Sequence, residues 1–188
     1  GDRPLAVFSQ VKVQYCGRDV CGPVSFALHP GERVVLDGKN GSGKSSLLKV
    51  LLGESIPHSG TITTSAGLVV SYVPQDTAHL NGLLSHFAEK HHLDESLFKG
   101  ILRKMGFERV QFEKKMEDFS AGQKKKVLLA ASLCQPAHLY VWDEPLNFVD
   151  LHTRLQITSL LRQAQPTMLF VEHDRAFQEE IATQKISL

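Results

Sequence analysis

The sequence predicts an α/β fold in which a mostly parallel β-sheet is flanked by helices. Three short apolar runs carry this prediction, namely residues 33–37 (RVVLD), 138–143 (HLYVWD) and 167–172 (TMLFVE). Continuous short apolar runs are typical of the strands of a parallel sheet, which are buried on both faces. Helix-forming segments separate the runs, which is the alternation that α/β proteins show.

Two stretches before and after the first run predict an antiparallel β subdomain. Residues 11–15 (VKVQY) alternate apolar and polar side chains, as a half-exposed strand does, and residues 24–28 are a second strand. A further β segment opens at residues 59–60, where Ser-Gly favours a change of direction.

The middle of the chain predicts a short helical subdomain, at about residues 76–119, inserted into the α/β pattern. It follows an apolar strand over residues 67–74 (GLVVSYVP) that ends at Gln75. Asp94 can cap a helix whose apolar face contains Leu97, Phe98, Ile101, Leu102 and Met105. Helical pieces are also expected at residues 83–92 and, highly charged, at residues 108–116.

The last third of the chain returns to the α/β alternation. Good helix formers occupy residues 124–133, and residues 150–163 are amphipathic. Residues 185–188 predict an edge strand. We therefore expect residues 1–188 to form a single domain.

A phosphate-binding loop lies between the first buried strand and a helix predicted over residues 46–53. Residues 38–46 read GKNGSGKSS and match G-x-x-x-x-G-K-S, the Walker A pattern of P-loop NTPases. Glycines let backbone N–H groups curl around phosphate oxygens, and the helix N-terminus adds positive potential. Lys44 then reaches the β- and γ-phosphates, and the Ser45 hydroxyl can ligate Mg²⁺. The candidate residues for ATP are Gly38, Asn40, Gly41, Ser42, Gly43, Lys44, Ser45 and Ser46.

Polar residues at strand ends are candidates for hydrolysis, because ligands of open α/β sheets bind there. Asp143 can hold Mg²⁺, and Glu144 is a candidate general base for the attacking water. Gln75 could bridge metal and water, and His173 could donate a hydrogen bond to the γ-phosphate. Taken singly, a strand-end glutamine or histidine is more often structural, and two adjacent carboxylates can be a solvated strand end.

Composition excludes several function classes. The net charge of +1 gives no bulk electrostatic argument for nucleic acid or a membrane surface. No apolar run approaches the roughly 20 residues of a membrane span, so no direct membrane insertion is expected. Three cysteines without a zinc or disulfide pattern favour a reducing, cytoplasmic location. Because the chain does not begin with Met, we expect a fragment of a longer protein.

The ordered motifs resemble those of an ABC ATPase domain over nearly the whole chain. Residues 38–45, Gln75, residues 120–123 (SAGQ), residues 143–144, Asp150 and His173 resemble its Walker A, Q-loop, signature, Walker B, D-loop and H-loop. The resemblance implies ATP and Mg²⁺ as ligands. It implies Glu144, His173 and Gln75 as catalytic residues, and metal contacts from Ser45, Gln75 and Asp143. It also implies that Tyr15 stacks on adenine.

The same resemblance implies a second ABC domain as partner. Two such domains close head to tail over two ATP molecules, so Ser120, Gly122 and Gln123 would contact nucleotide bound to the partner. The signature departs from LSGGQ, with Phe119 in place of Leu and Ala121 in place of the first Gly. Alanine still offers its backbone N–H to the γ-phosphate if its φ is negative. The departure therefore bears on the rate of hydrolysis rather than on this contact.

The sequence around these motifs resembles that of the ABC-F class. FSAGQKKKVLLAASL, VWDEPLNFVD, SYVPQD and FVEHDRAF resemble antibiotic-resistance proteins of the Lsa and Vga type. Such proteins carry two ABC domains in one chain, lack a membrane domain and act on the ribosome, and the KISL ending resembles the close of the second domain. Lys114, Lys115 and Lys124–Lys126 could then face ribosomal RNA, or form an ordinary solvated surface.

Two other classes compete with this interpretation. The ATP-binding subunit of a membrane transporter shares every catalytic motif, and the presence of a second ABC domain in the same full gene product would separate the two classes. A DNA-maintenance ATPase needs a long coiled coil that splits the domain, and the sequence has no heptad run.

Overall fold

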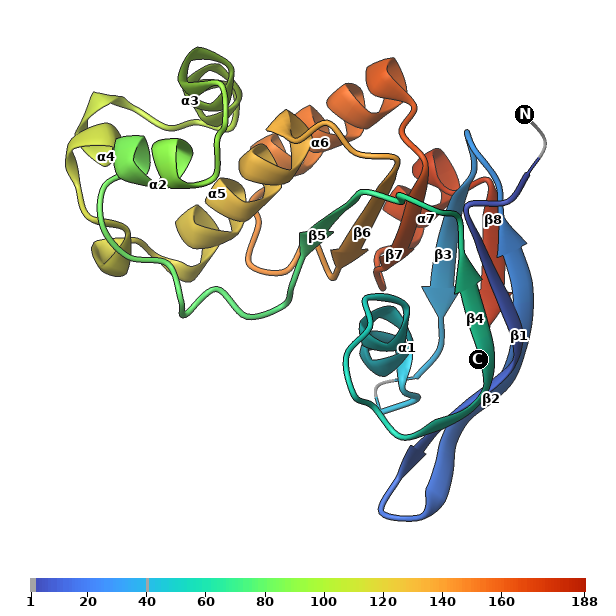
Figure 1. Cartoon of the computed structure of the whole chain (residues 1–188). Helices are drawn as coiled ribbons and strands as arrows, with labels where there is room; N and C mark the ends of the chain where they lie inside the picture. Colours follow the sequence, from blue (N-terminus) through green and yellow to red (C-terminus); the bar gives the residue numbers. More distant parts are fainter. Residues whose placement is uncertain (1–2, 40) are drawn as a thin grey trace.

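The computed structural model of the chain, which describes residues 3–39 and 41–188, contains a five-stranded parallel sheet (Figure 1). Its strand order is β5-β6-β7-β3-β8, and every neighbouring pair is parallel. This confirms the α/β fold class and the predicted edge strand at the end of the chain. The strands are β3 (Arg33–Asp37), β5 (Val70–Val73), β6 (Leu139–Asp143), β7 (Met168–Val171) and β8 (Gln184–Ser187).

A separate three-stranded antiparallel sheet forms the predicted β subdomain. It has the order β2-β1-β4, with β1 at Ala6–Tyr15, β2 at Arg18–Leu28 and β4 at His58–Thr64. Phe8 and Phe26 lie opposite each other in the β1–β2 pair, and their rings stack with centroids 4.4 Å apart. Strands β1 and β2 begin five and six residues earlier than the predicted ranges 11–15 and 24–28, because backbone pairing extends beyond the segment with alternating apolar and polar side chains.

Alternate side chains of the parallel strands enter two hydrophobic clusters, as the period of a strand requires. Val34 and Leu36 pack in one cluster with the antiparallel sheet and with α1 (Lys44–Leu51), whereas Val35 faces the other. The second cluster is completed by apolar side chains of α5 (Ala121–Cys134), α6 (Leu151–Ala164) and α7 (Arg175–Ile181).

The helical segment between β5 and α5 contains α2 (Leu84–Lys90), α3 (Glu95–Lys104) and α4 (Arg109–Glu113), which lie away from the sheets in Figure 1. Asp94 caps α3 as predicted, with its Oδ1 accepting from the Leu97 N–H at 3.0 Å. Leu97 itself was wrongly assigned to the apolar face, because 49% of it is exposed. Within the described ranges, no helix is long and apolar enough to cross a membrane.

The charged helix predicted at residues 108–116 is shorter than expected. The backbone becomes extended at Lys114, and a 3₁₀ turn follows at Met116–Asp118. Met116 is fully buried, and its N–H donates to the Gly82 carbonyl at 2.8 Å. Burial of this side chain and satisfaction of its backbone donor therefore outweigh continuation of a highly charged helix.

A buried polar network fastens α5 to the edge of the parallel sheet. Trp142 of β6 is fully buried and donates its Nε1–H to the Ser132 Oγ at 2.8 Å. The Ser132 Oγ lies 2.7 Å from the Ser71 Oγ of β5. The network sets the position of α5, whose first residues form the signature.

Ser132→Ala is expected to lower the free energy of unfolding by about 1–3 kcal/mol, because it leaves the buried Trp142 N–H without an acceptor. Denaturant unfolding of the wild type and variant measures the change. Ser96→Ala removes the same atom from an exposed site on α3 and should stay within about 0.5 kcal/mol. Equal stability of Ser132→Ala and the wild type would contradict the role given to the network.

Candidate active site

The phosphate loop joins β3 to α1, as the motif requires. Gly43 precedes α1 with φ at 83°, a left-handed conformation that favours glycine. A Cβ at this position would lie 2.7 Å from the Cβ of Cys21 in β2. The β1–β2 hairpin therefore packs directly on the loop, and only glycine fits between them. Asn40, another predicted ligand, lies outside the described residues.

The side chain of Lys44 lies against the phosphate loop. Its side chain is buried, with 6% exposed, and its Nζ donates to the Gly38 carbonyl. The Ser42 hydroxyl is also buried, and the structure gives it no hydrogen-bond partner among the described residues. The loop thus holds polar groups that are incompletely paired within the protein, as expected of a site built for an anionic ligand.

A cavity of about 220 Å³ brings three separate motifs together. It is lined by residues of the phosphate loop and the start of α1, by Gln75 after β5 and by Glu144 after β6. The phosphate-loop residues in it are Gly41, Gly43, Lys44, Ser45 and Ser46. Of the four predicted strand-end residues, Gln75 and Glu144 line this cavity, whereas Asp143 and His173 are not in its lining.

Asp143 provides a test of whether the site fits Mg²⁺. The residue is 1% exposed, and its Oδ1 has no hydrogen-bond partner in the described part of the chain. Burial raises the pKa of Asp143, while the neighbouring Ser45 hydroxyl acts in the opposite direction. An orphaned carboxylate oxygen beside a hydroxyl is a suitable oxygen donor set for Mg²⁺, which is usually held by one or two carboxylates and substrate phosphates. The residues therefore fit the metal.

Glu144 and His173 are in contact, with 2.9 Å between Glu144 Oε1 and His173 Nε2. They follow β6 and β7, which are neighbours in the sheet, and the Glu144 N–H donates to the Val171 carbonyl at 2.8 Å. Glu144 has a φ of 50°, a strained backbone conformation of the kind that occurs at functional sites. This arrangement can hold a carboxylate base beside a hydrogen-bond donor.

The signature residues lie in a second cavity, of about 500 Å³. Ser120 caps α5, and its Oγ accepts from the Gln123 N–H at 3.1 Å, while the Gln123 Oε1 accepts from the Ser120 N–H at 2.9 Å. The Gln123 side chain is therefore engaged in a capping box. Among the described residues, none is common to the linings of this cavity and the phosphate cavity, and this lining consists of Ser120, Ala121, Gly122, Gln123, Lys126, Phe148 and Asp150.

The signature substitutions are compatible with the local backbone. Ala121 is the first residue of α5, so its backbone does not need glycine, and Phe119 is buried against Phe107. Gly122 has a different constraint, because a Cβ there would lie 2.5 Å from the Phe148 carbonyl oxygen. Tyr15, at the end of β1, is 72% exposed, which leaves its ring accessible to a base.

Neither alternative given for Lys124–Lys126, a shared RNA-facing group or a solvated surface, holds for all three residues. Lys125 is 1% exposed and donates to the Pro74 carbonyl at 3.4 Å, and Lys126 pairs with Asp150 at 3.0 Å. Burial lowers the pKa of Lys125, whereas the nearby Asp143, Glu144 and Glu172 act to raise it. Three consecutive helical residues point in different directions, so their shared charge could not place them on one face.

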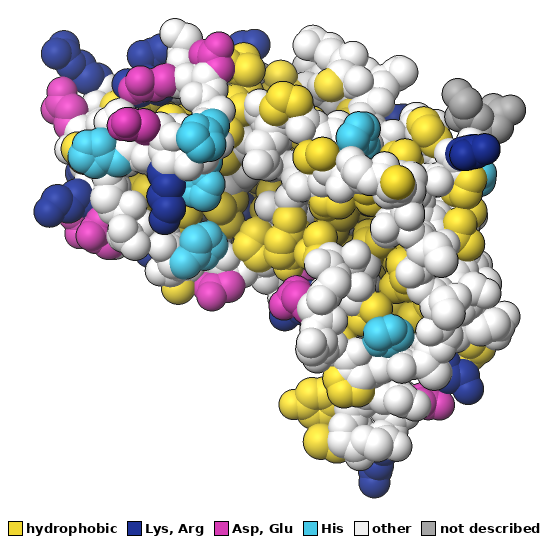
Figure 2. Space-filling view, viewed as in Figure 1, with side chains coloured by type: hydrophobic (Ala, Val, Ile, Leu, Met, Phe, Trp, Pro, Cys, Tyr) yellow, Lys and Arg dark blue, Asp and Glu magenta, His cyan; other side chains and the backbone are white. Residues whose placement is uncertain are grey.

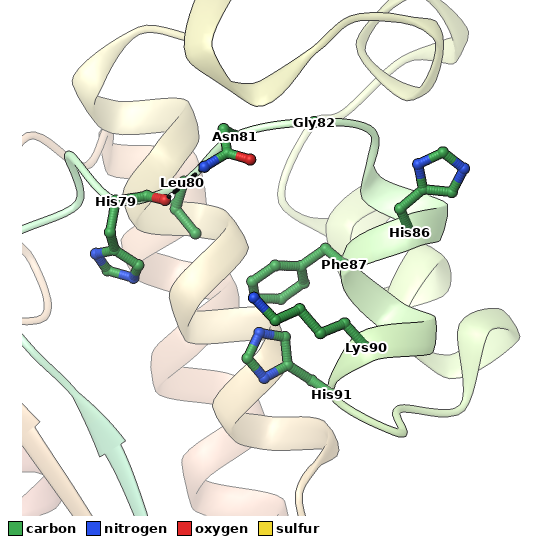
Figure 3. Close-up of a pocket in the computed structure, with 8 residues that line it drawn as sticks. All are labelled: His79, Leu80, Asn81, Gly82, His86, Phe87, Lys90 and His91. Carbon is green, nitrogen blue, oxygen red and sulfur yellow. Dashed lines mark hydrogen bonds between the residues drawn. The ribbon is translucent and has the colours of Figure 1, made fainter.

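A third cavity, of about 310 Å³, lies beside α2 and contains none of the predicted site residues (Figure 3). Phe87 and His91 contact each other with ring centroids 4.3 Å apart. Burial, and then the charges of Lys90, His79 and His92, lower the pKa of His91. On the face in Figure 2, positive and negative side chains are mixed over this part of the molecule, which is not a purely basic surface.

Comparison with known proteins gives a family and three informative relatives. The family model described as "ABC transporter" matches residues 21–147. The probable ATP-binding protein YheS of Escherichia coli K12 is 32% identical over 178 residues, which cover 92% of this chain and 28% of YheS. The ribosome protection protein VmlR of Bacillus subtilis 168 is 30% identical over 167 residues, covering 86% of this chain and 30% of VmlR.

Another relative, whose length is closer to that of this chain, has a name that refers to zinc import. The zinc import ATP-binding protein ZnuC of Buchnera aphidicola subsp. Schizaphis graminum is 32% identical over 182 residues, covering 92% of this chain and 76% of ZnuC. A solved ATP-binding subunit of an ABC transporter has the same fold, with a TM-score of 0.78 at 23% identity over 98% of this chain and 85% of that one. The chain spans less than a third of the length of YheS and VmlR.

Asp143→Asn is expected to raise the stability of the nucleotide-free domain at neutral pH by about 1 kcal/mol, because it removes an incompletely paired buried charge. A carboxyl whose pKa is raised by folding loses its contribution to stability as pH rises through the folded-state pKa. The advantage of the variant should therefore shrink as pH falls to about 4. Denaturant unfolding of the variant and the wild type between neutral pH and about pH 4 measures this difference in stability.

Asp19→Asn is the matched control, since it removes the same charge from an exposed pair with Lys12. It should change stability little at any pH. With ATP present, added Mg²⁺ should stabilise the wild type and not Asp143→Asn. A variant that is less stable than the wild type at neutral pH would contradict the assignment of Asp143 as an unsatisfied charge.

Proposed function

The chain belongs to the ABC transporter family as an ABC ATP-binding domain, and from this premise we propose that it hydrolyses ATP with Mg²⁺ in a site completed by a second ABC domain. The observation that carries the proposal is the cavity in which the phosphate loop, Gln75 and Glu144 meet. Its residues supply the phosphate contacts, the metal ligands and the base that phosphoryl transfer to water requires.

Each residue has a role in this proposal. Lys44 and the backbone N–H groups of the phosphate loop bind the β- and γ-phosphates. Ser45 and Asp143, with Gln75, would hold Mg²⁺, which when bound supplies positive charge to the phosphates. Tyr15 stacks on the adenine.

Hydrolysis is assigned to the Glu144–His173 pair. A water molecule attacks the γ-phosphorus, the bond between this phosphorus and the oxygen bridging to ADP breaks, and the proton of the water passes to the Glu144 carboxylate. His173 donates a hydrogen bond to the γ-phosphate. The 2.9 Å contact between Glu144 Oε1 and His173 Nε2 supports this assignment, because it holds the two side chains beside each other.

The need for a partner follows from the separation of the two cavities. Ser120 and Gly122 line a cavity that, in the described part of the chain, shares no residue with the phosphate cavity. In a head-to-tail pair they contact nucleotide held by the partner, while the partner's signature covers the nucleotide of this chain. Stabilisation of the γ-phosphate from both sides is the reason that one domain alone hydrolyses slowly.

For the whole protein we propose an ABC-F type, of the Lsa and Vga kind, that acts on the ribosome in the cytoplasm. The match to VmlR supports this proposal, because its name states ribosome protection. The exposed Lys114 and Lys115 remain candidates for RNA contact. The second candidate is a transporter ATP-binding subunit, which the match to ZnuC over most of its length favours.

Turnover per site is expected to rise with protein concentration, because the isolated chain must pair to complete a site. Glu144→Gln should lower turnover about 100-fold or more while leaving ATP bound, since the amide cannot accept the proton. Lys44→Ala is the binding control and should lose most ATP affinity in calorimetry, because it removes a charge-assisted contact. Fast turnover that is independent of concentration would contradict the composite site.

The full-length gene product is expected to co-sediment with ribosomes in ATP, most strongly as the Glu144→Gln variant, because blocked hydrolysis preserves the closed ATP-bound pair. Cells that express it should tolerate ribosome-targeting antibiotics better than cells that express Lys44→Ala. Recovery of the protein with membranes through a membrane-spanning partner would favour the transporter candidate instead.

A further inference from the structure

We propose that Glu172 is a positioning residue that holds Glu144 and His173 together for hydrolysis. The inference rests on the proposed ATPase function and adds a residue to it. Glu172 directly follows β7, is 7% exposed and was not among the residues that sequence reasoning selected.

The carboxylate of Glu172 joins the two loops that carry the pair. Its Oε1 accepts from the Leu146 N–H at 3.0 Å, and its Oε2 accepts from the Asp174 N–H at 3.0 Å. Leu146 is two residues beyond Glu144, and Asp174 is adjacent to His173. One side chain therefore fixes the backbone on both sides of the 2.9 Å contact between Glu144 and His173.

The surroundings of Glu172 keep this bridge in place. The Gln178 side chain donates to the Glu172 backbone carbonyl, which fixes the start of the H-loop. Arg154 of α6 pairs with Asp174 at 2.6 Å and so secures the second loop. Lys125, buried in α5, contributes positive charge near Glu172.

The bridge requires a carboxylate, because it needs two oxygen acceptors on one side chain. Glutamine has the same shape and only one acceptor, so its NH₂ group would face one of the two N–H donors. A buried donor left without an acceptor is costly, and the loop that carries it would move.

The geometry of the catalytic pair depends on such support. Glu144 has a strained φ of 50°, and strain of this kind persists only where neighbouring contacts determine the conformation. The side chain of His173 is 44% exposed, so packing on its ring does little to fix it. A shift of about 1 Å in a reacting group can reduce turnover by about 100-fold.

The experiment compares Glu172→Gln and Glu172→Ala with Glu180→Gln, which removes the same charge from an exposed pair with Arg162. Amide hydrogen exchange, read by NMR, reports the Leu146 and Asp174 N–H groups, and calorimetry and turnover report ATP affinity and hydrolysis. We expect Glu172→Gln to speed exchange at one of these amides and Glu172→Ala at both. Turnover should fall about 10- to 100-fold, with ATP affinity within about twofold of the wild type. Glu180→Gln should match the wild type.

The outcomes separate the alternatives. Faster exchange with unchanged turnover would overturn the positioning role and leave a structural one, and unchanged exchange would overturn the bridge itself. If the wild type binds ATP and shows no turnover at any concentration, the proposed hydrolysis fails. In that case the His173 ring resonances still test the inference, because they should shift in Glu172→Gln and not in Glu180→Gln.

Discussion

Parallel pairing of β6, β7 and β3 is the constraint on which the candidate site depends. Asp143 lies opposite Val171, and Leu36 lies opposite Val171 on the other side of β7. The three strands therefore end at one level, and the segments that follow them leave the sheet side by side. This register brings the phosphate loop, the acidic pair and His173 to one edge of the sheet, where contacts such as that between Glu144 and His173 can form.

Buried charge is concentrated around this edge of the sheet. In the part of the chain that the structure describes, the charged side chains that are buried are Lys44, Lys125, Asp143 and Glu172. Removing such groups from water is costly, and they occur mainly where function needs them. Two of these side chains are positive and two are negative, so the buried charges nearly cancel in sum.

The helix α5 connects the two proposed half-sites within one chain. Its first residues form the signature, Lys125 in its second turn contacts the Pro74 carbonyl next to Gln75, and Ser132 near its end binds Trp142. The backbone of Gly122 also approaches the Phe148 carbonyl closely. The contacts of α5 therefore link the segment that carries the signature to the backbone beside Gln75 and to β6.

The sequence by itself determined the features that consecutive residues create. The phosphate loop, the strand before it and the Asp94 cap depend on local conformational preferences, so spacing was sufficient to predict them. Only the tertiary structure decided that Lys125 is buried, that Glu144 contacts His173 and that Glu172 bridges their loops. These outcomes depend on which strands are neighbours and on the direction of each helix face, because contacts between residues far apart in the chain leave no periodic signal in it.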